Sequence, residues 1–166
     1  MEISYSRYRQ IKDTINGCKK ILGTTDPFKI CELLGIIIRL VPLSSNMLGF
    51  ADIRHVNADV LNFRNGQLRI FDATIFLSEV LTSYSRKITC AHELGHVLLQ
   101  YDDDINLFDC VDASKDLKEY EANLFAIELM PHIYNNQTID YRTLNKSELQ
   151  HFMNRKVSYT FYTIGS

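Results

Sequence analysis

The segment of residues 85–101 reads Ser-Arg-Lys-Ile-Thr-Cys-Ala-His-Glu-Leu-Gly-His-Val-Leu-Leu-Gln-Tyr. Its apolar residues are distributed around most of a helical circumference, which predicts a buried helix over 85–101. His92 and His96 are four residues apart, so they lie one turn apart on the same helix face. Gly95 costs about 1 kcal/mol of helix stability relative to alanine, which suggests that another part of the chain approaches closely there.

The two histidines predict a metal site on this helix. Their imidazoles can reach one Zn²⁺ ion at the distances of about 2.0–2.1 Å that zinc requires. Glu93 follows the first histidine, where its carboxylate can take a proton from a water activated by the metal. The alternatives are a pair of core histidines bonded to carbonyl groups and a carboxylate that only supports the helix. The sequence favours His92 and His96 as metal ligands and Glu93 as the general base.

A catalytic zinc ion usually has three protein ligands, so a third ligand is expected. The position six residues after His96, where a metzincin carries a histidine, is Asp102. A second helix, predicted over Ser114–Met130, places Glu121 within an apolar stripe, where an unpaired carboxylate is unfavourable. Glu121 is therefore the first choice as third ligand, and Glu119, on the other face, is the second. The alternative for Glu121 is an ion pair with a lysine or arginine.

Periodicity and breaker residues place the remaining elements. The predicted strands precede the two central helices, which indicates an α+β domain. We expect one domain over residues 1–166, with a small, mostly antiparallel sheet packed against helices that include the helix of the two histidines. The other predicted helices are Tyr5–Leu22, Pro27–Leu34 and Asn145–Asn154, and the predicted strands are Ile36–Val41, Leu48–Ile53, Asp59–Phe63 and Ala73–Leu77.

Composition excludes several functional classes. The length of 166 residues suits a single core. The net charge of -2 provides no excess of basic residues for binding nucleic acid. No apolar run approaches the roughly 20 residues of a membrane span. The four cysteines form no CxxC pair, which is typical of reduced thiols in a cytoplasmic protein. The oligomeric state does not follow from the sequence.

Three motifs resemble the ImmA/IrrE metallopeptidase family: His92-Glu-Leu-Gly-His96, Glu119-Tyr-Glu-Ala-Asn-Leu-Phe-Ala126 and Leu129-Met-Pro131. The resemblance covers roughly residues 49–131. It implies a zincin-like fold of the gluzincin type, zinc as the cofactor and Glu121 as third ligand. It also implies that strand Ala73–Leu77 lies beside the cleft and holds an extended peptide. The implied substrate is a helix-turn-helix transcriptional repressor, cleaved to derepress mobile-element or stress genes.

The sequence departs from the family pattern at Gln100, where members often carry a histidine. Two other functions compete with a peptidase: a zinc-containing regulatory protein that binds the repressor without cleaving it, and a structural zinc domain. The last is weakest, because structural zinc sites favour cysteine ligands. Three aromatic residues, Tyr120, His132 and Tyr134, are candidates for stabilising the transition state, but the sequence places none of them.

Overall fold

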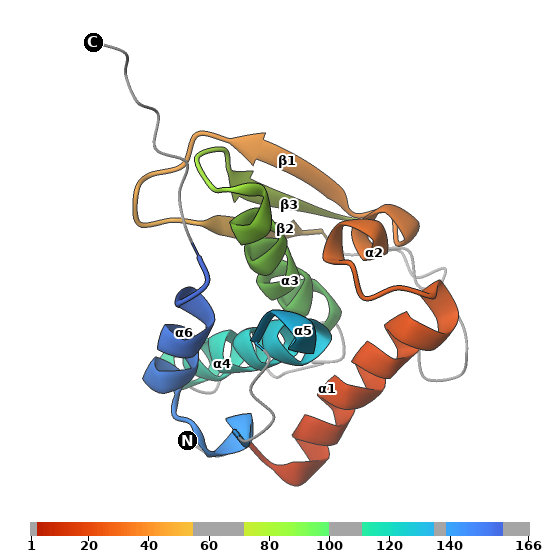
Figure 1. Cartoon of the computed structure of the whole chain (residues 1–166), viewed down its shortest axis with the longest axis vertical. Coiled ribbons are helices and arrows are strands. Elements are labelled where there is room, and N and C mark those ends of the chain that lie inside the picture. Colours follow the sequence, from red (N-terminus) through yellow and green to blue (C-terminus); the bar gives the residue numbers. More distant parts are fainter. Residues whose placement is uncertain (1–2, 55–71, 100–110, 135–138, 158–166) are drawn as a thin grey trace.

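A three-stranded sheet covers one side of the helix that carries the two histidines. The computed structural model describes residues 3–54, 72–99, 111–134 and 139–157. Strands β1 (Ile37–Val41), β2 (Gly49–Ile53) and β3 (Ala73–Ser78) lie in the order β1-β3-β2, so β3 is the central strand. Helix α3 (Ser83–Leu99) runs beneath them (Figure 1). The predicted α+β class is confirmed.

The sheet is mixed rather than mostly antiparallel. β1 runs parallel to β3, with Ile38 opposite Ile75, whereas β2 runs antiparallel to β3, with Phe50 opposite Phe76. Alternation of apolar residues predicts that a strand exists, but it does not state the direction of its neighbour, which explains the difference. The predicted strand at Asp59–Phe63 lies outside the described residues.

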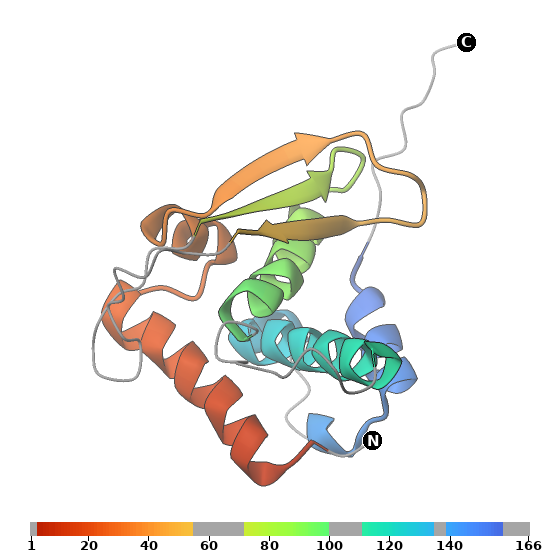
Figure 2. The ribbon, with the colours of Figure 1, turned by 180° about the vertical axis from the view of Figure 1, so that it is seen from behind.

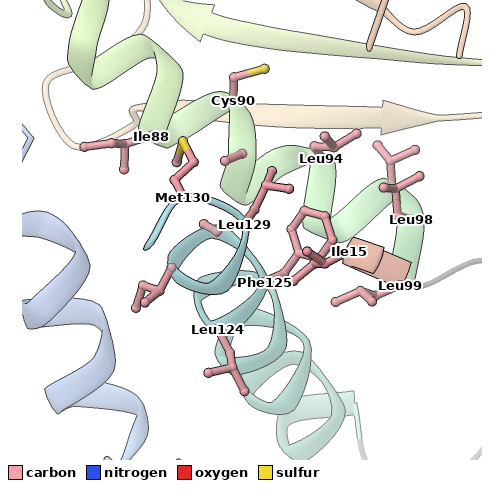
Figure 3. Close-up of a cluster of buried hydrophobic side chains, with 14 of the residues drawn as sticks. Ile15, Ile88, Cys90, Leu94, Leu98, Leu99, Leu124, Phe125, Leu129 and Met130 are labelled. Atoms are coloured by element: carbon pink, nitrogen blue, oxygen red, sulfur yellow. The ribbon is translucent and has the colours of Figure 1, made fainter. Parts of the chain in front are cut away.

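Helix α4 (Val111–Leu129) crosses α3 on the side away from the sheet (Figure 2). The interface is filled by apolar side chains of both helices, which Figure 3 shows in detail; these include Ile88, Leu94, Leu98, Leu124, Phe125 and Leu129. Gly95 lies where the helices approach most closely. A Cβ atom at this position would lie only 3.1 Å from the Cα of Ala122. The expected close approach at Gly95 is therefore found, and its partner is α4.

The N-terminal helix α1 (Tyr5–Gly17) also packs against α4. It begins at Ser4, whose side chain accepts a hydrogen bond from the backbone of Arg7. It continues as a π-helical turn, Cys18–Leu22, and ends at Gly23, which has a φ of 71°. Glycine adopts this left-handed conformation without steric cost, so the predicted end of the helix is confirmed.

Three further helices and a 3₁₀ turn belong to the described part of the chain. They are α2 (Pro27–Leu33), α5 (Pro131–Tyr134), a 3₁₀ turn (Tyr141–Thr143) and α6 (Lys146–Asn154). α6 begins with a capping box formed by Asn145 and Glu148, and it packs against α4. None of the helices in the described parts of the chain combines the length and apolar character that a membrane span needs.

Candidate metal site

Three side chains converge at the crossing of α3 and α4. The Nε2 atoms of His92 and His96 lie 3.2 Å apart. Glu119 of α4 approaches both, with its carboxylate oxygens 3.4 Å from Nε2 of His92 and 3.3 Å from Nε2 of His96. One ligand atom from each residue lies within 4.8 Å of the other two, and the three residues form a group that could hold a metal ion.

Glu121, the expected third ligand, lies outside this group. Its carboxylate forms two hydrogen bonds with Arg7 of α1, at 2.7 Å from Nε and 2.8 Å from Nη2. The structure thus brings Glu119 to the two histidines and gives Glu121 the ion pair that the sequence analysis held as its alternative.

The apolar stripe could not distinguish the two glutamates because α4 is buried on nearly every side. All residues from Tyr120 to Ile127 are buried, so each face of this segment looks like a core face. The face of Glu121 packs toward α1, and the face of Glu119 turns toward α3 and an open cleft. The signal that could have ranked Glu119 first is the cationic Arg7, which offers Glu121 a partner from another helix.

Glu93 lies beside the histidines and is almost completely buried, with 6% of its surface exposed. This burial raises the pKa of Glu93 above its usual value of 4.5, although the neighbouring histidines oppose the shift. A backbone hydrogen bond from Ala51 of β2 reaches the Glu93 carboxylate. Glu93 is therefore oriented by the edge of the sheet and is more basic than an ordinary carboxylate.

The histidines and Glu119 perturb one another strongly. Burial disfavours protonation of His92, but the hydrogen bond to Glu119 and the charge of Glu93 outweigh it and raise the pKa of His92 above 6.5. The hydrogen bonds to His92 and His96 in turn hold the pKa of Glu119 well below its usual range. A cluster of groups that shift one another in this way, at the bottom of a cleft, is typical of a functional site.

The site opens into a cleft of about 490 Å³. One wall is β2, and the opposite wall is formed by α4 and α6; the lining residues include Gly49, Ala51, Ile53, Lys118, Gln150 and Asn154. Tyr120, His132 and Tyr134, the candidates for stabilising the transition state, do not line this cleft. Tyr120 and Tyr134 are instead buried in the core.

Among the strands in the described residues, β2 rather than β3 borders the cleft and lies at the edge of the sheet. β3 pairs with both neighbours, so it has no free edge for a peptide, and the expectation for Ala73–Leu77 is corrected. At one end of β2, the backbone N–H of Ser78 donates a hydrogen bond to the carbonyl of Leu48. At the other end, the backbone N–H of Arg54 donates to the carbonyl of Asp72. Because antiparallel strands alternate between bonded and non-bonded pairs, the peptide groups of Gly49, Ala51 and Ile53 face away from β3.

Comparison with known families agrees with a metallopeptidase-type protein. A family model described as the IrrE N-terminal-like domain of peptidase family M78 matches residues 31–134. This match covers more than half of the chain, and the chain therefore belongs to the ImmA/IrrE family. No curated protein and no solved structure matches the chain.

Proposed function

We propose that this protein is a zinc-dependent endopeptidase, in which His92, His96 and Glu119 hold zinc and Glu93 is the general base. The supporting observation is that the Nε2 atoms of His92 and His96 lie 3.2 Å apart and that each faces one oxygen of Glu119, at 3.4 and 3.3 Å, with one ligand atom from each residue within 4.8 Å of the others. When ligand atoms surround a zinc ion tetrahedrally at bond lengths of about 2.0–2.1 Å, neighbouring ligand atoms lie about 3.3 Å from one another. Charge-assisted hydrogen bonds between nitrogen and oxygen are shorter, at about 2.7–2.9 Å. The separation of the two histidine nitrogens thus matches that of two zinc ligands, and the distances to Glu119 are longer than those of strong charge-assisted hydrogen bonds, which supports a shared metal.

The donor set fits the proposed chemistry. Two histidines and one carboxylate are a known ligand set of catalytic zinc sites and leave one coordination position open. When bound, zinc supplies Lewis acidity, polarising a carbonyl oxygen and lowering the pKa of water. The fold is, on this proposal, zincin-like of the gluzincin type, with Glu119 in place of Glu121 as the third ligand.

Residues of this chain carry out the proton transfers and bind the substrate. The Glu93 carboxylate accepts the proton of the attacking water and then donates it to the leaving amine. The raised pKa of Glu93 makes it a better base, and the backbone N–H of Ala51 holds it in place. The side of β2 that faces away from β3, which no other described strand occupies, binds the substrate as an additional strand and so selects an extended segment of a protein. The peptide groups of Gly49 and Ile53 are the contacts available for this pairing.

The proposed substrate is a helix-turn-helix transcriptional repressor whose cleavage derepresses mobile-element or stress genes. Its support is membership of the ImmA/IrrE family and the cleft beside strand β2. The alternative is a regulatory protein that keeps the zinc site and acts by binding the repressor. We further propose that it acts in the cytoplasm, where such a repressor is found, without binding nucleic acid directly.

The test compares wild type with Glu93→Gln, Glu119→Gln and Glu121→Gln. Bound zinc is counted by native mass spectrometry, and cleavage of a candidate helix-turn-helix repressor from the same genome is followed by electrophoresis. We expect one zinc and cleavage in wild type, zinc without cleavage in Glu93→Gln, and loss of zinc in Glu119→Gln. Glu121→Gln is the matched control on the same helix and retains both. Cleavage by Glu93→Gln would refute the assigned base, and derepression by that variant without cleavage would support the binding alternative.

A further inference from the structure

Two buried polar atoms near the metal site have no hydrogen-bond partner of ordinary geometry among the described residues: Nδ1 of His92 and Oδ1 of Asn123. Asn123 is fully buried, so water does not reach it. Leaving a buried polar group unpaired costs about 1–3 kcal/mol, and each such group therefore calls for an explanation.

The two atoms are chemically complementary. Nε2 of His92 points to the proposed metal site, and when a metal occupies Nε2 the neutral imidazole carries its proton on Nδ1, which is then a donor. Oδ1 of an asparagine is an acceptor. Asn123 follows Glu119 by four residues on α4, one helical turn further along the same face. A side-chain interaction between Asn123 and the His92 imidazole places the two groups within reach of each other.

The orientation of the Asn123 amide is set by α6. Its Nδ2 donates a hydrogen bond of 2.8 Å to Oε1 of Gln150. Gln150 in turn donates from Nε2 to Oδ1 of Asn154, at 3.1 Å. Each amide is thus fixed by the next, and the arrangement leaves Oδ1 as the Asn123 atom available to an Nδ1–H donor. Asn154 and Gln150 both line the cleft, so the chain of amides connects the cleft wall to the back of His92.

We propose that Asn123 is a positioning residue of the metal site: its Oδ1 accepts a hydrogen bond from Nδ1–H of His92 and so keeps Nε2 free for the metal. Gln150 holds Asn123 in the required orientation. Metal-ligating histidines generally need such a partner on the second nitrogen, and its loss lowers metal affinity about 10–100-fold. This inference rests on the proposed function, because it assigns a metal to Nε2 of His92.

The experiment uses three variants of the full chain. Asn123→Leu removes the acceptor at similar volume, Asn123→Asp keeps an acceptor oxygen, and Gln150→Leu removes the group that orients Asn123. Glu121→Gln is the control, since it alters a buried polar residue of α4 that faces away from the site. Zn²⁺ affinity is measured by competition with a chromophoric chelator. The tautomer of His92 is read from its ring ¹⁵N shifts in chelator-treated protein at pH 8.

We expect the Nδ1–H tautomer in wild type, in Asn123→Asp and in the control. Asn123→Leu loses this preference and binds Zn²⁺ about 10–100-fold more weakly, and Gln150→Leu shows the same change to a smaller degree. Wild-type affinity together with an unchanged His92 tautomer in Asn123→Leu overturns the proposal. If Asn123→Leu does not fold, the same result in Gln150→Leu overturns it.

The two readouts separate failure of this inference from failure of the proposed function. If wild type binds no Zn²⁺, the proposed function fails, but the tautomer measurement still decides whether Asn123 orients His92. If wild type binds Zn²⁺ and the variants do not differ from it, only the inference fails.

Discussion

The ion pair between Arg7 and Glu121 predicts that this glutamate stabilises the fold and does not hold the metal. Arg7 donates to both oxygens of Glu121 and, at 3.1 Å, to the carbonyl of Leu99. The Glu121 side chain is only 5% exposed and that of Arg7 is 20% exposed. Replacing Arg7 by methionine keeps most of the apolar stem but leaves the buried carboxylate without its partner.

The magnitude follows from hydrogen bonds to a charged group, whose removal costs about 1.5–3 kcal/mol. In a domain of this size, 1 kcal/mol corresponds to roughly 2–4 °C in Tm. We therefore expect Arg7→Met to lower the Tm by about 3–12 °C. Glu121→Gln is expected to lower it less, because the partly exposed Arg7 retains access to water. The double variant Arg7→Met/Glu121→Leu removes both charges, and we expect it to recover part of the lost stability.

The assay is thermal unfolding followed by circular dichroism, with chelator present so that bound metal does not contribute to stability. Zn²⁺ affinity is measured in parallel, and we expect it to stay within about twofold of wild type in both single variants. Loss of Zn²⁺ binding in Glu121→Gln with an unchanged Tm would refute the reasoning and restore Glu121 as a ligand.

Three further predictions concern packing, protonation and the buried thiol. In Gly95→Val, the new Cβ lies 3.1 Å from the Cα of Ala122, so the added side chain forces α3 and α4 apart. We expect the free energy of unfolding, measured in urea, to fall by about 1–3 kcal/mol, and Zn²⁺ binding to weaken. In chelator, protonated His92 and ionised Glu119 stabilise the fold between their usual pKa values of 6.5 and 4.5. That contribution is lost as pH rises through the raised pKa of His92, so Zn²⁺ should increase the Tm more at pH 8 than at pH 6; an equal increase would contradict the assignment. Burial raises the pKa of the Cys18 thiol from 9.0 to about 12, so stability should fall as pH rises from 9 toward 12, and peptide mapping after thiol labelling at pH 8 should find Cys18 unmodified in folded protein.

Much of this fold follows from local patterns in the sequence. Gly23 and the Asp26-Pro27 pair mark the end of one helix and the beginning of the next, because a left-handed glycine and an N-capping aspartate act on their immediate neighbours. The expected helix at 85–101 is found at Ser83–Leu99, and the expected strand at Ala73–Leu77 is found at Ala73–Ser78. These features depend only on residues close together in the chain.

The sequence by itself determined that His92 and His96 lie together, since a helix places residues four apart on one face whatever surrounds it. Only the tertiary structure decided the third member of the group, because the choice between Glu119 and Glu121 depends on which faces of α4 meet α3 and α1. It also decided that β2 is the edge strand beside the cleft, since strand order arises from pairing across distant segments. Helical periodicity is local, whereas ligand sets and sheet edges depend on contacts between residues far apart in sequence.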